Sequence, residues 1–475
     1  MLFPTIDFAL FFVVVFLGHW VLNHDRRTWV LFMIGASYVF YAWANWRYVF
    51  LLAGVSVISQ LAAQAVARRE DPRRRARAAA LGVAATLAPL LCFKYYGFVT
   101  VNVANLSGSI GSGWTLPLIQ VVLPVGVSFY TFMAISYVVD VHRRVFPLTG
   151  WGDLFLYLSF FPHLVAGPIV RPNELIPQFD ERRDPRHVDV VGAAWLILGG
   201  LFKKVVIANF LAAAIADPLF GDPARRSAWD AIVGLIAYAV QIYCDFSGYT
   251  DIAIGIAKLL GFEFPQNFDR PYAARSIRDF WRRWHMTLSR WLRDYLYIPL
   301  GGNRKGGKRT TVNLMLTMLL GGLWHGAAWH FVVWGGLHGV YLVTGQWKRR
   351  RREAGALAAP PETRAVWWAQ RAAAFGLVCV AWAFFRADSV EVALELLGRI
   401  FTGWTTPTEL VSPAVLLAIA VGLGTQFVPR GPGRKLRASL GRLHPVPLGL
   451  ICSVALFAIT TMGPRGVAPF IYFQF

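Results

Sequence analysis

The chain has 475 residues, of which 56% are hydrophobic and only 15% are charged, and its mean hydropathy is +0.47. In a soluble protein of this length about a quarter of the residues would be charged, so an ordinary soluble domain is excluded. The net charge of +21 would suggest nucleic acid in a soluble protein. Here most Arg and Lys lie in short loops between apolar runs, as in cytoplasmic loops of membrane proteins. We therefore predict an all-α, polytopic integral membrane protein that contacts the lipid bilayer and binds no nucleic acid.

The cysteines and the N-terminus indicate whether the chain has disulfides, a metal site or a removable signal peptide. The cysteines lie in or beside apolar runs and form no CxxC pair, so they are interpreted as small buried residues, with no disulfide framework and no metal site. The first run, Met1–Leu22, lacks a basic n-region and an A-x-A cleavage site, and is expected to stay as a first span. The four cysteines are Cys92, Cys244, Cys379 and Cys452.

Apolar runs long enough to cross a membrane recur through the first third of the chain. The loop Arg68–Arg77 between two of them is strongly basic, which places it in the cytoplasm and the N-terminus outside. The loop Thr100–Thr115 carries no charge and is expected to be external. The predicted spans are Ile6–Leu22, Trp29–Ala44, Tyr48–Ala67, Ala78–Phe98 and Leu116–Asp140.

The next apolar segment, Leu154–Pro168, is short and is interrupted by two prolines and a glycine. A broken or re-entrant segment is expected rather than a full span. Irregular backbone at membrane depth persists only where it lines a cavity or is buried in protein.

Two further spans carry charges. Val188–Ala216 contains Lys203 and Lys204, which are expected to snorkel toward the headgroups, although binding an anionic group is an alternative. Ala231–Leu260 contains the carboxylates of Asp245 and Asp251, which must be paired or hydrated inside an apolar run. Hydrogen bonding to a neighbouring helix and lining of a polar tunnel both remain open for them.

The most charged region, Phe262–Arg309, is predicted to form an amphipathic helix on the membrane surface. An interfacial anchor explains most of it, but a histidine among arginines, His285, is expected to stay neutral and able to accept a proton. The Gly-rich basic loop Pro299–Arg309 is suited to phosphates but lacks a Walker pattern. One face of the helix would carry Arg278, Arg282, His285 and Ser289, and the other Trp281, Trp284, Leu288, Trp291 and Tyr295.

The apolar segment Val312–Val343 contains His325 among glycines, with Trp324 and Trp329 on either side. A histidine in a membrane segment indicates function by default, and the glycines allow the helix to bend or break beside it. A hydrogen-bonded structural histidine is the alternative. Roughly ten to twelve spans are expected in all, ending with Trp367–Phe385, Pro413–Phe427 and Pro447–Met462, with a basic loop at Arg430–Arg442.

Several motifs together resemble the membrane-bound O-acyltransferase (MBOAT) family, and most closely its branch of alginate O-acetyltransferase membrane subunits. The resemblance covers most of the chain from about Leu123 to Trp334. The motifs are Phe161–His163 with Ala166–Pro168, Tyr243–Asp251, Pro265–Phe268, Phe280–His285, Trp291–Arg304 and Gly322–Gly326.

The resemblance implies a fold and site residues. The fold would be a single domain over residues 1–475, a ring of tilted helices with re-entrant and interfacial helices around a tunnel. His325 would be the near-invariant catalytic histidine and His285 the second important polar position. The phosphates of a donor are expected at Arg278, Arg282, Asn303 and Arg304, for which lipid headgroups are the alternative ligand, and tunnel support at Asp245, Asp251 and Trp324.

The activity that the resemblance implies is O-acylation. An acetyl group from a cytoplasmic donor, acetyl-CoA, would cross the cell (inner) membrane to an extracytoplasmic polysaccharide such as alginate, completed by an extracytoplasmic acetyltransferase partner. No bound cofactor and no metal are expected. Peptidoglycan O-acetylation and D-alanylation-type transfer remain alternatives. A polysaccharide transporter, with buried Asp and His in broken helices, is the alternative from another class.

Overall fold

The computed structural model describes residues 1–111, 114–117, 123–358 and 360–463. Across these ranges the regular structure is helical and no residue lies in a β-strand, which confirms the all-α class. The chain divides into two compact units. One comprises Met1–Ala193 with Ala253–Pro265, and the other comprises Ala194–Ile252 with the described residues from Gln266 onward. The single-domain interpretation stays a prediction.

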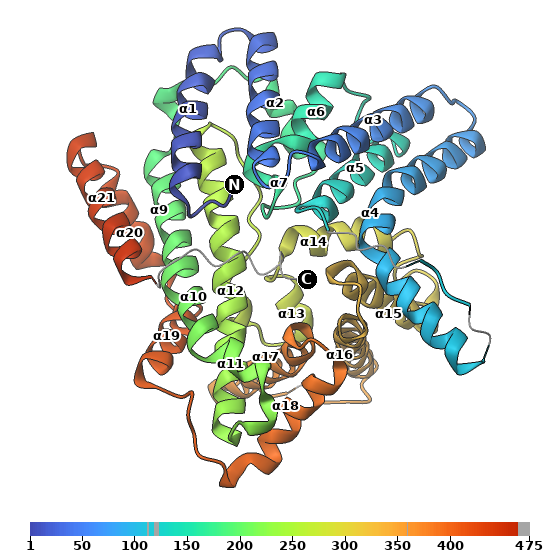
Figure 1. The fold of residues 1–475 in the computed structure, drawn as a ribbon, viewed down its shortest axis with the longest axis vertical. Helices are drawn as coiled ribbons and strands as arrows, with labels where there is room; N and C mark the ends of the chain where they lie inside the picture. The colour runs from blue at the N-terminus through green and yellow to red at the C-terminus, as the bar shows by residue number, and fades with distance from the viewer. Residues whose placement is uncertain (112–113, 118–122, 359, 464–475) are drawn as a thin grey trace. The chain divides into compact units, whose positions relative to one another are not determined.

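In the first unit, successive helices pair as α1 with α2 and α3 with α4, and α5 packs against α3 and α4 (Figure 1). Two of the predicted spans, α1 and α3, match the sequence-based bounds at both ends. The helices are α1 (Ile6–Leu22), α2 (Arg26–Ala42), α3 (Tyr48–Ala67), α4 (Pro72–Ser109), α5 (Val127–His142), α6 (Trp151–Ser159), α7 (Phe161–Leu164) and α8 (Pro172–Leu175).

The predicted external loop from Thr100 onward is wrong over its first part, because α4 continues to Ser109. Polar side chains there bond to the carbonyl one turn earlier. The Thr100 hydroxyl donates to Tyr96 O at 2.9 Å, and the Asn102 amide donates to Phe98 O at 2.7 Å. A polar composition therefore does not end this helix. Residues 112, 113 and 118–122 lie outside the described residues.

The predicted broken segment is confirmed. Helices α6 and α7 are short, and their residues Leu154, Tyr157 and His163 have no exposed surface. The Nε2–H of His163 donates to Tyr157 O at 2.9 Å, and the Tyr157 hydroxyl donates to Val170 O at 2.8 Å. The backbone that this break releases is satisfied inside the protein, as irregular structure in an apolar environment requires.

The second unit contains most of the remaining helices. One of them corrects the sequence analysis, because the predicted basic loop at Arg430–Arg442 is largely helix α20. The elements are α9 (Val190–Leu201), η3 (Phe202–Ala208), α10 (Asn209–Leu211), η4 (Ala212–Ala216), α11 (Asp217–Gly221), α12 (Ala228–Leu259), α13 (Ile277–Trp281), α14 (Met286–Trp291), η7 (Leu292–Tyr297), α15 (Gly306–His325), α16 (Trp329–Glu353), α17 (Arg364–Arg386), α18 (Val390–Thr402), α19 (Pro413–Gly424), α20 (Arg430–Leu440) and α21 (Pro445–Met462). Helices α9 and α12 each have residues in both units.

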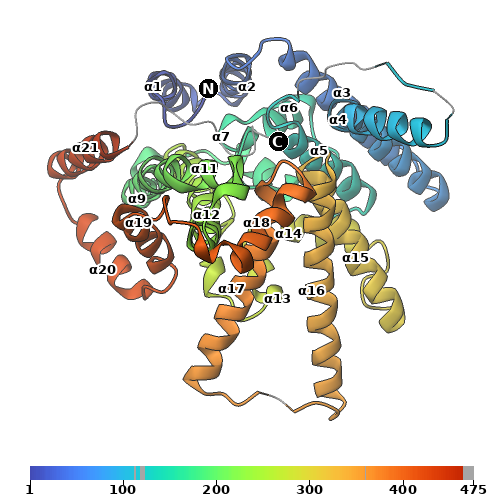
Figure 2. The ribbon, with the colours of Figure 1, turned by 60° about the horizontal axis from the view of Figure 1, so that its bottom comes forward.

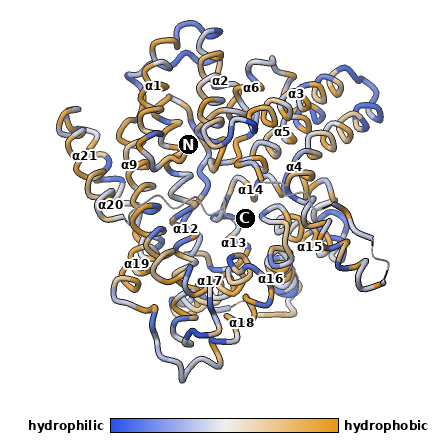
Figure 3. The backbone as a smooth tube through the Cα atoms, in the orientation of Figure 1, coloured by the Kyte–Doolittle hydropathy of each residue, from blue (hydrophilic) through white to orange (hydrophobic). Residues whose placement is uncertain are grey.

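Among the described residues, six helical stretches are long and apolar enough to cross a membrane. The turns that join α1 to α2 and α3 to α4 are polar, whereas the helices themselves are mostly apolar (Figure 3). The prediction of ten to twelve spans also counts shorter apolar helices such as α1 and α19. The six stretches are Tyr48–Ala67, Pro72–Ser109, Val190–Gly221, Ala228–Leu259, Arg364–Arg386 and Pro445–Met462. The protein is thus a multi-pass membrane protein.

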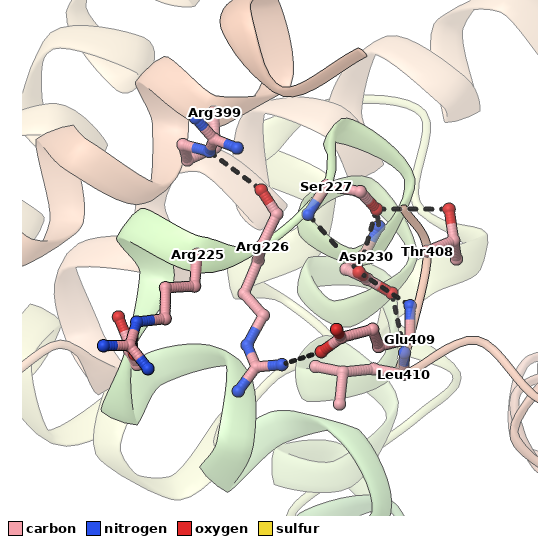
Figure 4. Close-up of polar contacts among 9 residues, drawn as sticks. Arg225, Arg226, Ser227, Asp230, Arg399, Thr408, Glu409 and Leu410 are labelled. Carbon is pink, nitrogen blue, oxygen red and sulfur yellow. Dashed lines mark hydrogen bonds and ion pairs between the residues drawn. The ribbon is translucent and has the colours of Figure 1, made fainter. Parts of the chain in front are cut away.

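Asp230, in the first turn of α12, fastens the loop that follows α18 (Figure 4). This carboxylate is fully buried. It accepts hydrogen bonds from Leu410 N at 2.9 Å, from Glu409 N at 3.2 Å and from the Ser227 hydroxyl at 2.8 Å. The loop backbone therefore finds its acceptors in a side chain at a helix start, where a negative charge is also favoured.

Asp230→Ala should lower the free energy of unfolding by about 1–3 kcal/mol, because the loop amides lose their buried acceptor. Denaturant unfolding in detergent micelles measures this change in the free energy of unfolding. Proteolysis of the loop after Gly403 should also become faster, because its backbone is no longer held by Asp230. Glu409→Ala is the matched control. It removes an ion pair with Arg226 in which the glutamate is largely exposed, which is worth about 0–1 kcal/mol. Equal losses in the two variants would contradict this account.

Candidate active site

The long apolar segment around His325 breaks into two helices, as the glycines in it predict. Helix α15 ends at His325, Gly326 is extended, and α16 begins at Trp329. The two helices lie side by side in Figures 1 and 2. The break places His325 at the end of a helix, where its ring is positioned by the contacts of both helices.

The two helices approach to backbone contact through glycines. A Cβ added to Gly335 would lie 2.3 Å from Met318 O, and a Cβ added to Gly322 would lie 2.3 Å from Phe331 O. Helix packing this close requires residues without side chains. Because Gly322 precedes His325 by less than one turn of α15, this contact also sets the position of the imidazole.

Gly335→Ala should separate α15 from α16 and lower the free energy of unfolding by about 1–3 kcal/mol, as overpacking does. Because the separation moves His325, it should also reduce activity. The neighbouring Gly336 is the matched control, since its Cβ would meet Leu319 Cδ2 at an ordinary 3.7 Å. Thermal unfolding of the two purified variants compares the same substitution one residue apart. If Gly336→Ala were as harmful as Gly335→Ala, the close approach would not be the cause.

His325 is 4% exposed and lies among aromatic rings. Its ring centroid is 4.9 Å from those of Trp324 and Trp334 and 5.2 Å from that of Phe385. Trp329, which follows His325 in the sequence, is 58% exposed. The sequence contains no sign that Trp334 contacts His325, because only the break before α16 turns Trp334 back toward that histidine.

The predicted continuous amphipathic helix is also wrong. Helix α13 ends at Trp281 and α14 begins at Met286, and His285 between them has a left-handed backbone with φ +41°. His285 has no exposed surface, whereas Arg278 and Arg282 are exposed. The histidine therefore does not share a face with the arginines.

His285 and His325 nevertheless belong to one aromatic cluster. The His285 ring centroid is 4.7 Å from that of Phe246 and 6.3 Å from that of Trp324, the residue next to His325. Its Nδ1 lies 3.1 Å from Asn267 Oδ1. The structure thus brings together the two histidines that the sequence singled out, with Trp324 adjacent to both.

The carboxylates of α12 pair with the lysines of η3, so the prediction that the lysines snorkel is wrong. Lys203 Nζ lies 2.5 Å from Asp251 Oδ2, and Lys204 Nζ lies 2.5 Å from Asp245 Oδ1. The second pair is the more buried, with exposed fractions of 2% and 4%. Buried charges require such partners, and the tunnel role of the two aspartates stays a prediction.

The four predicted donor-binding side chains are exposed. They lie in α13, at its end, and in the turn before α15, and no hydrogen bond or ion pair joins them to one another in the described part of the chain. A phosphate site there stays a prediction. Over the same residues, no three His, Cys, Asp or Glu side chains are grouped to hold a metal ion. The four residues are Arg278, Arg282, Asn303 and Arg304.

Comparison with known proteins gives concordant matches. The MBOAT, membrane-bound O-acyltransferase family, matches residues 151–382. The chain is 41% identical over 426 residues to the probable alginate O-acetylase AlgI of Pseudomonas aeruginosa, over 89% of this chain and 79% of that protein. It is 38% identical over 517 residues to the probable alginate O-acetylase AlgI of Azotobacter vinelandii, over 100% of both chains. It is 34% identical over 424 residues to the peptidoglycan O-acetyltransferase of Helicobacter pylori, over 83% of this chain and 78% of that protein.

These relatives span most of the chain, and the family match includes His285, His325 and the paired lysines and aspartates. The chain belongs to the membrane-bound O-acyltransferase family and is a multi-pass membrane O-acyltransferase.

Proposed function

We propose that this protein passes an acetyl group from cytoplasmic acetyl-CoA across the membrane, for O-acetylation of an extracytoplasmic polysaccharide such as alginate. The names of its Pseudomonas and Azotobacter relatives support acetyl as the acyl group and alginate as the acceptor. The basic stretch Arg68–Arg77 covers the turn after α3 and the first residues of α4. It supports a cytoplasmic assignment for that end of the two helices, and hence an extracytoplasmic N-terminus. The protein would reside in the cell (inner) membrane.

The observation that carries the proposal is the burial of His325 and His285 in one aromatic cluster. As the acceptor oxygen bonds to the acetyl carbon, the carbon–sulfur bond of the thioester breaks. His325 takes the proton from the hydroxyl, since an imidazole suits proton transfer near neutral pH. His285 relays that proton to the departing sulfur, so that CoA leaves as the thiol and both histidines return to the neutral form.

The donor would enter from the cytoplasmic side. Arg278 and Arg282 at α13, with Asn303 and Arg304 before α15, are exposed and would hold the donor phosphates through charge-assisted hydrogen bonds. Asp245 and Asp251, held by their lysines, would support the path of the acyl group. An extracytoplasmic acetyltransferase partner would complete transfer to the polymer.

Peptidoglycan is the second candidate acceptor, because the Helicobacter pylori relative is named for it. The two candidates differ only in the hydroxyl that is acylated, so both agree with the same histidine chemistry. Labelled products separate them, since enzymatic digestion of the polymers releases acetylated muramic acid in one case and acetylated uronic acid in the other.

Membrane vesicles of defined orientation test the donor and the direction of transfer. Inside-out vesicles that contain the polysaccharide and the partner, given acetyl-CoA labelled in the acetyl group, should place the label on polysaccharide in the lumen. Right-side-out vesicles given the same donor should not. Label transfer only in right-side-out vesicles would overturn the direction, and transfer of D-alanine but not of acetate would overturn the acyl group.

A further inference from the structure

Asn267 is a buried residue in the extended segment that precedes α13, and it is 1% exposed. Its oxygens accept hydrogen bonds from the start of α14. Met286 N donates to the Asn267 main-chain oxygen at 2.9 Å, and Thr287 N donates to Oδ1 at 3.2 Å. The residue before a helix usually satisfies such amides with its own side chain. Here that residue is His285, and the oxygens of Asn267 accept the hydrogen bonds of these amides instead.

The same carbonyl oxygen fixes the tautomer of His285. The Thr287 N–H can only donate, so the atom that it meets is the oxygen of the Asn267 amide and not its nitrogen. The Thr287 hydroxyl donates to this oxygen as well, at 2.9 Å. Because Oδ1 can only accept, His285 Nδ1, 3.1 Å away, must carry a proton and donate. In a neutral imidazole the remaining nitrogen, Nε2, then holds the lone pair.

Asn267 also supports an unusual backbone. His285 has φ +41° and ψ 55°, a left-handed conformation that residues with a side chain rarely adopt. Hydrogen bonds from the two residues that follow it to Asn267 oppose relaxation of this turn. With this turn held, the centroid of the imidazole ring stays 4.7 Å from that of Phe246 and 6.3 Å from that of Trp324. Strained positions of this kind are typical of functional sites.

We propose that Asn267 is the positioning residue of His285, holding its Nδ1–H so that Nε2 is the nitrogen that receives the proton from His325 and delivers it to the thioester sulfur. The inference rests on the proposed function for the identity of the reaction. The geometry at Asn267 does not depend on which acyl group or acceptor is used. The proton on Nδ1 stays in place throughout the cycle, because Asn267 Oδ1 accepts it in every step.

Charged residues lie beside the contacts of His285 on two of the neighbouring elements. Helix α12 presents Phe246, and its neighbour Asp245 pairs with Lys204 at 2.5 Å. Helix α15 presents Trp324 and, beyond it, His325, the other titratable ring. Arg283, in the turn before His285, pairs with Asp279 at 2.9 Å. Asn267 is uncharged, so a charge placed there acts on His285 directly.

The pH dependence of transfer tests the proposal. Asn267→Asp keeps an oxygen acceptor and adds a negative charge beside Nδ1–H, which favours the protonated ring. His285 then becomes neutral only at higher pH, and the acid limb of kcat/KM should move up by about 1–3 pH units. Thr287→Val is the matched control, because it removes the other side-chain donor to the same oxygen and should leave the limb where it is. An unmoved limb in a well-folded Asn267→Asp variant overturns the proposal.

Two further measurements keep the test decisive if that variant does not fold. Nitrogen-15 NMR of the parent protein, with the His285 signals assigned by comparison with His285→Gln, should show the proton on Nδ1, and a proton on Nε2 instead would overturn the proposal. Asn267→Ala should reduce kcat in the parent but cost little more in a His285→Gln background. Full, additive losses would mean that Asn267 acts independently of His285. If no variant and no parent transfers acetate while the NMR result holds, the proposed function fails and the positioning role stands.

Discussion

Replacing His325 by alanine is expected to lower the rate of acetyl transfer by about 100- to 10,000-fold, the usual contribution of general acid–base catalysis. The imidazole is 4% exposed and packed among Trp324, Trp334 and Phe385, so its removal leaves a small cavity but no buried charge. Initial rates in proteoliposomes, at equal amounts of inserted protein, measure the effect.

A buried histidine of α16, the helix that follows His325, provides the control for this experiment. His330 Nδ1 lies 2.9 Å from Phe384 O, to which it donates. His330→Gln keeps a donor at that place and should leave the rate within a few-fold of the parent. A His325→Ala variant that is folded and as active as His330→Gln would show that His325 is a structural histidine.

Lys204→Met is expected to produce the largest loss of stability, about 3–5 kcal/mol, because it removes the ammonium group that neutralises a buried carboxylate. Lys204 and Asp245 are 2% and 4% exposed, and their charged atoms lie 2.5 Å apart. A loss of this size should prevent accumulation of folded protein in the membrane. Denaturation in mixed micelles, or the yield of monodisperse protein, measures it.

The double variant Lys204→Met with Asp245→Leu should recover most of that loss, since an apolar pair of similar volume often replaces a buried ion pair without cost. The parallel pair is the matched control. Lys203 and Asp251 are less buried, at 15% and 29% exposed, so Lys203→Met should cost less than Lys204→Met. If Lys203→Met were the more harmful of the two, the assignment of the buried pair would be wrong.

Local patterns in the sequence predict much of the fold. The bounds of α1 and α3 follow from apolar runs that end at polar or basic residues, and the break after His325 follows from its glycines. The irregular α6–α7 segment follows from its prolines. In each case the determining residues are close together in the chain, and the structure adds only the packing.

The features that the sequence did not reveal depend on residues far apart in the chain. The predicted helix through His285 breaks because the amides after it bond to Asn267, and helical periodicity contains no sign of that acceptor. Lys204 does not snorkel because Asp245, on another helix, neutralises it inside the protein. Trp334 reaches His325 only because the chain reverses between α15 and α16.

The measurement that tests the central claim most directly is the acetyl-ester content of surface polysaccharides in cells that make either the parent protein or His325→Ala at equal membrane levels. The account predicts that acetyl esters of one polymer disappear in the variant while the amount of that polymer at the surface is unchanged. Persistence of every acetyl ester together with a fall in polymer export would contradict it, and would instead support a transport role for His325.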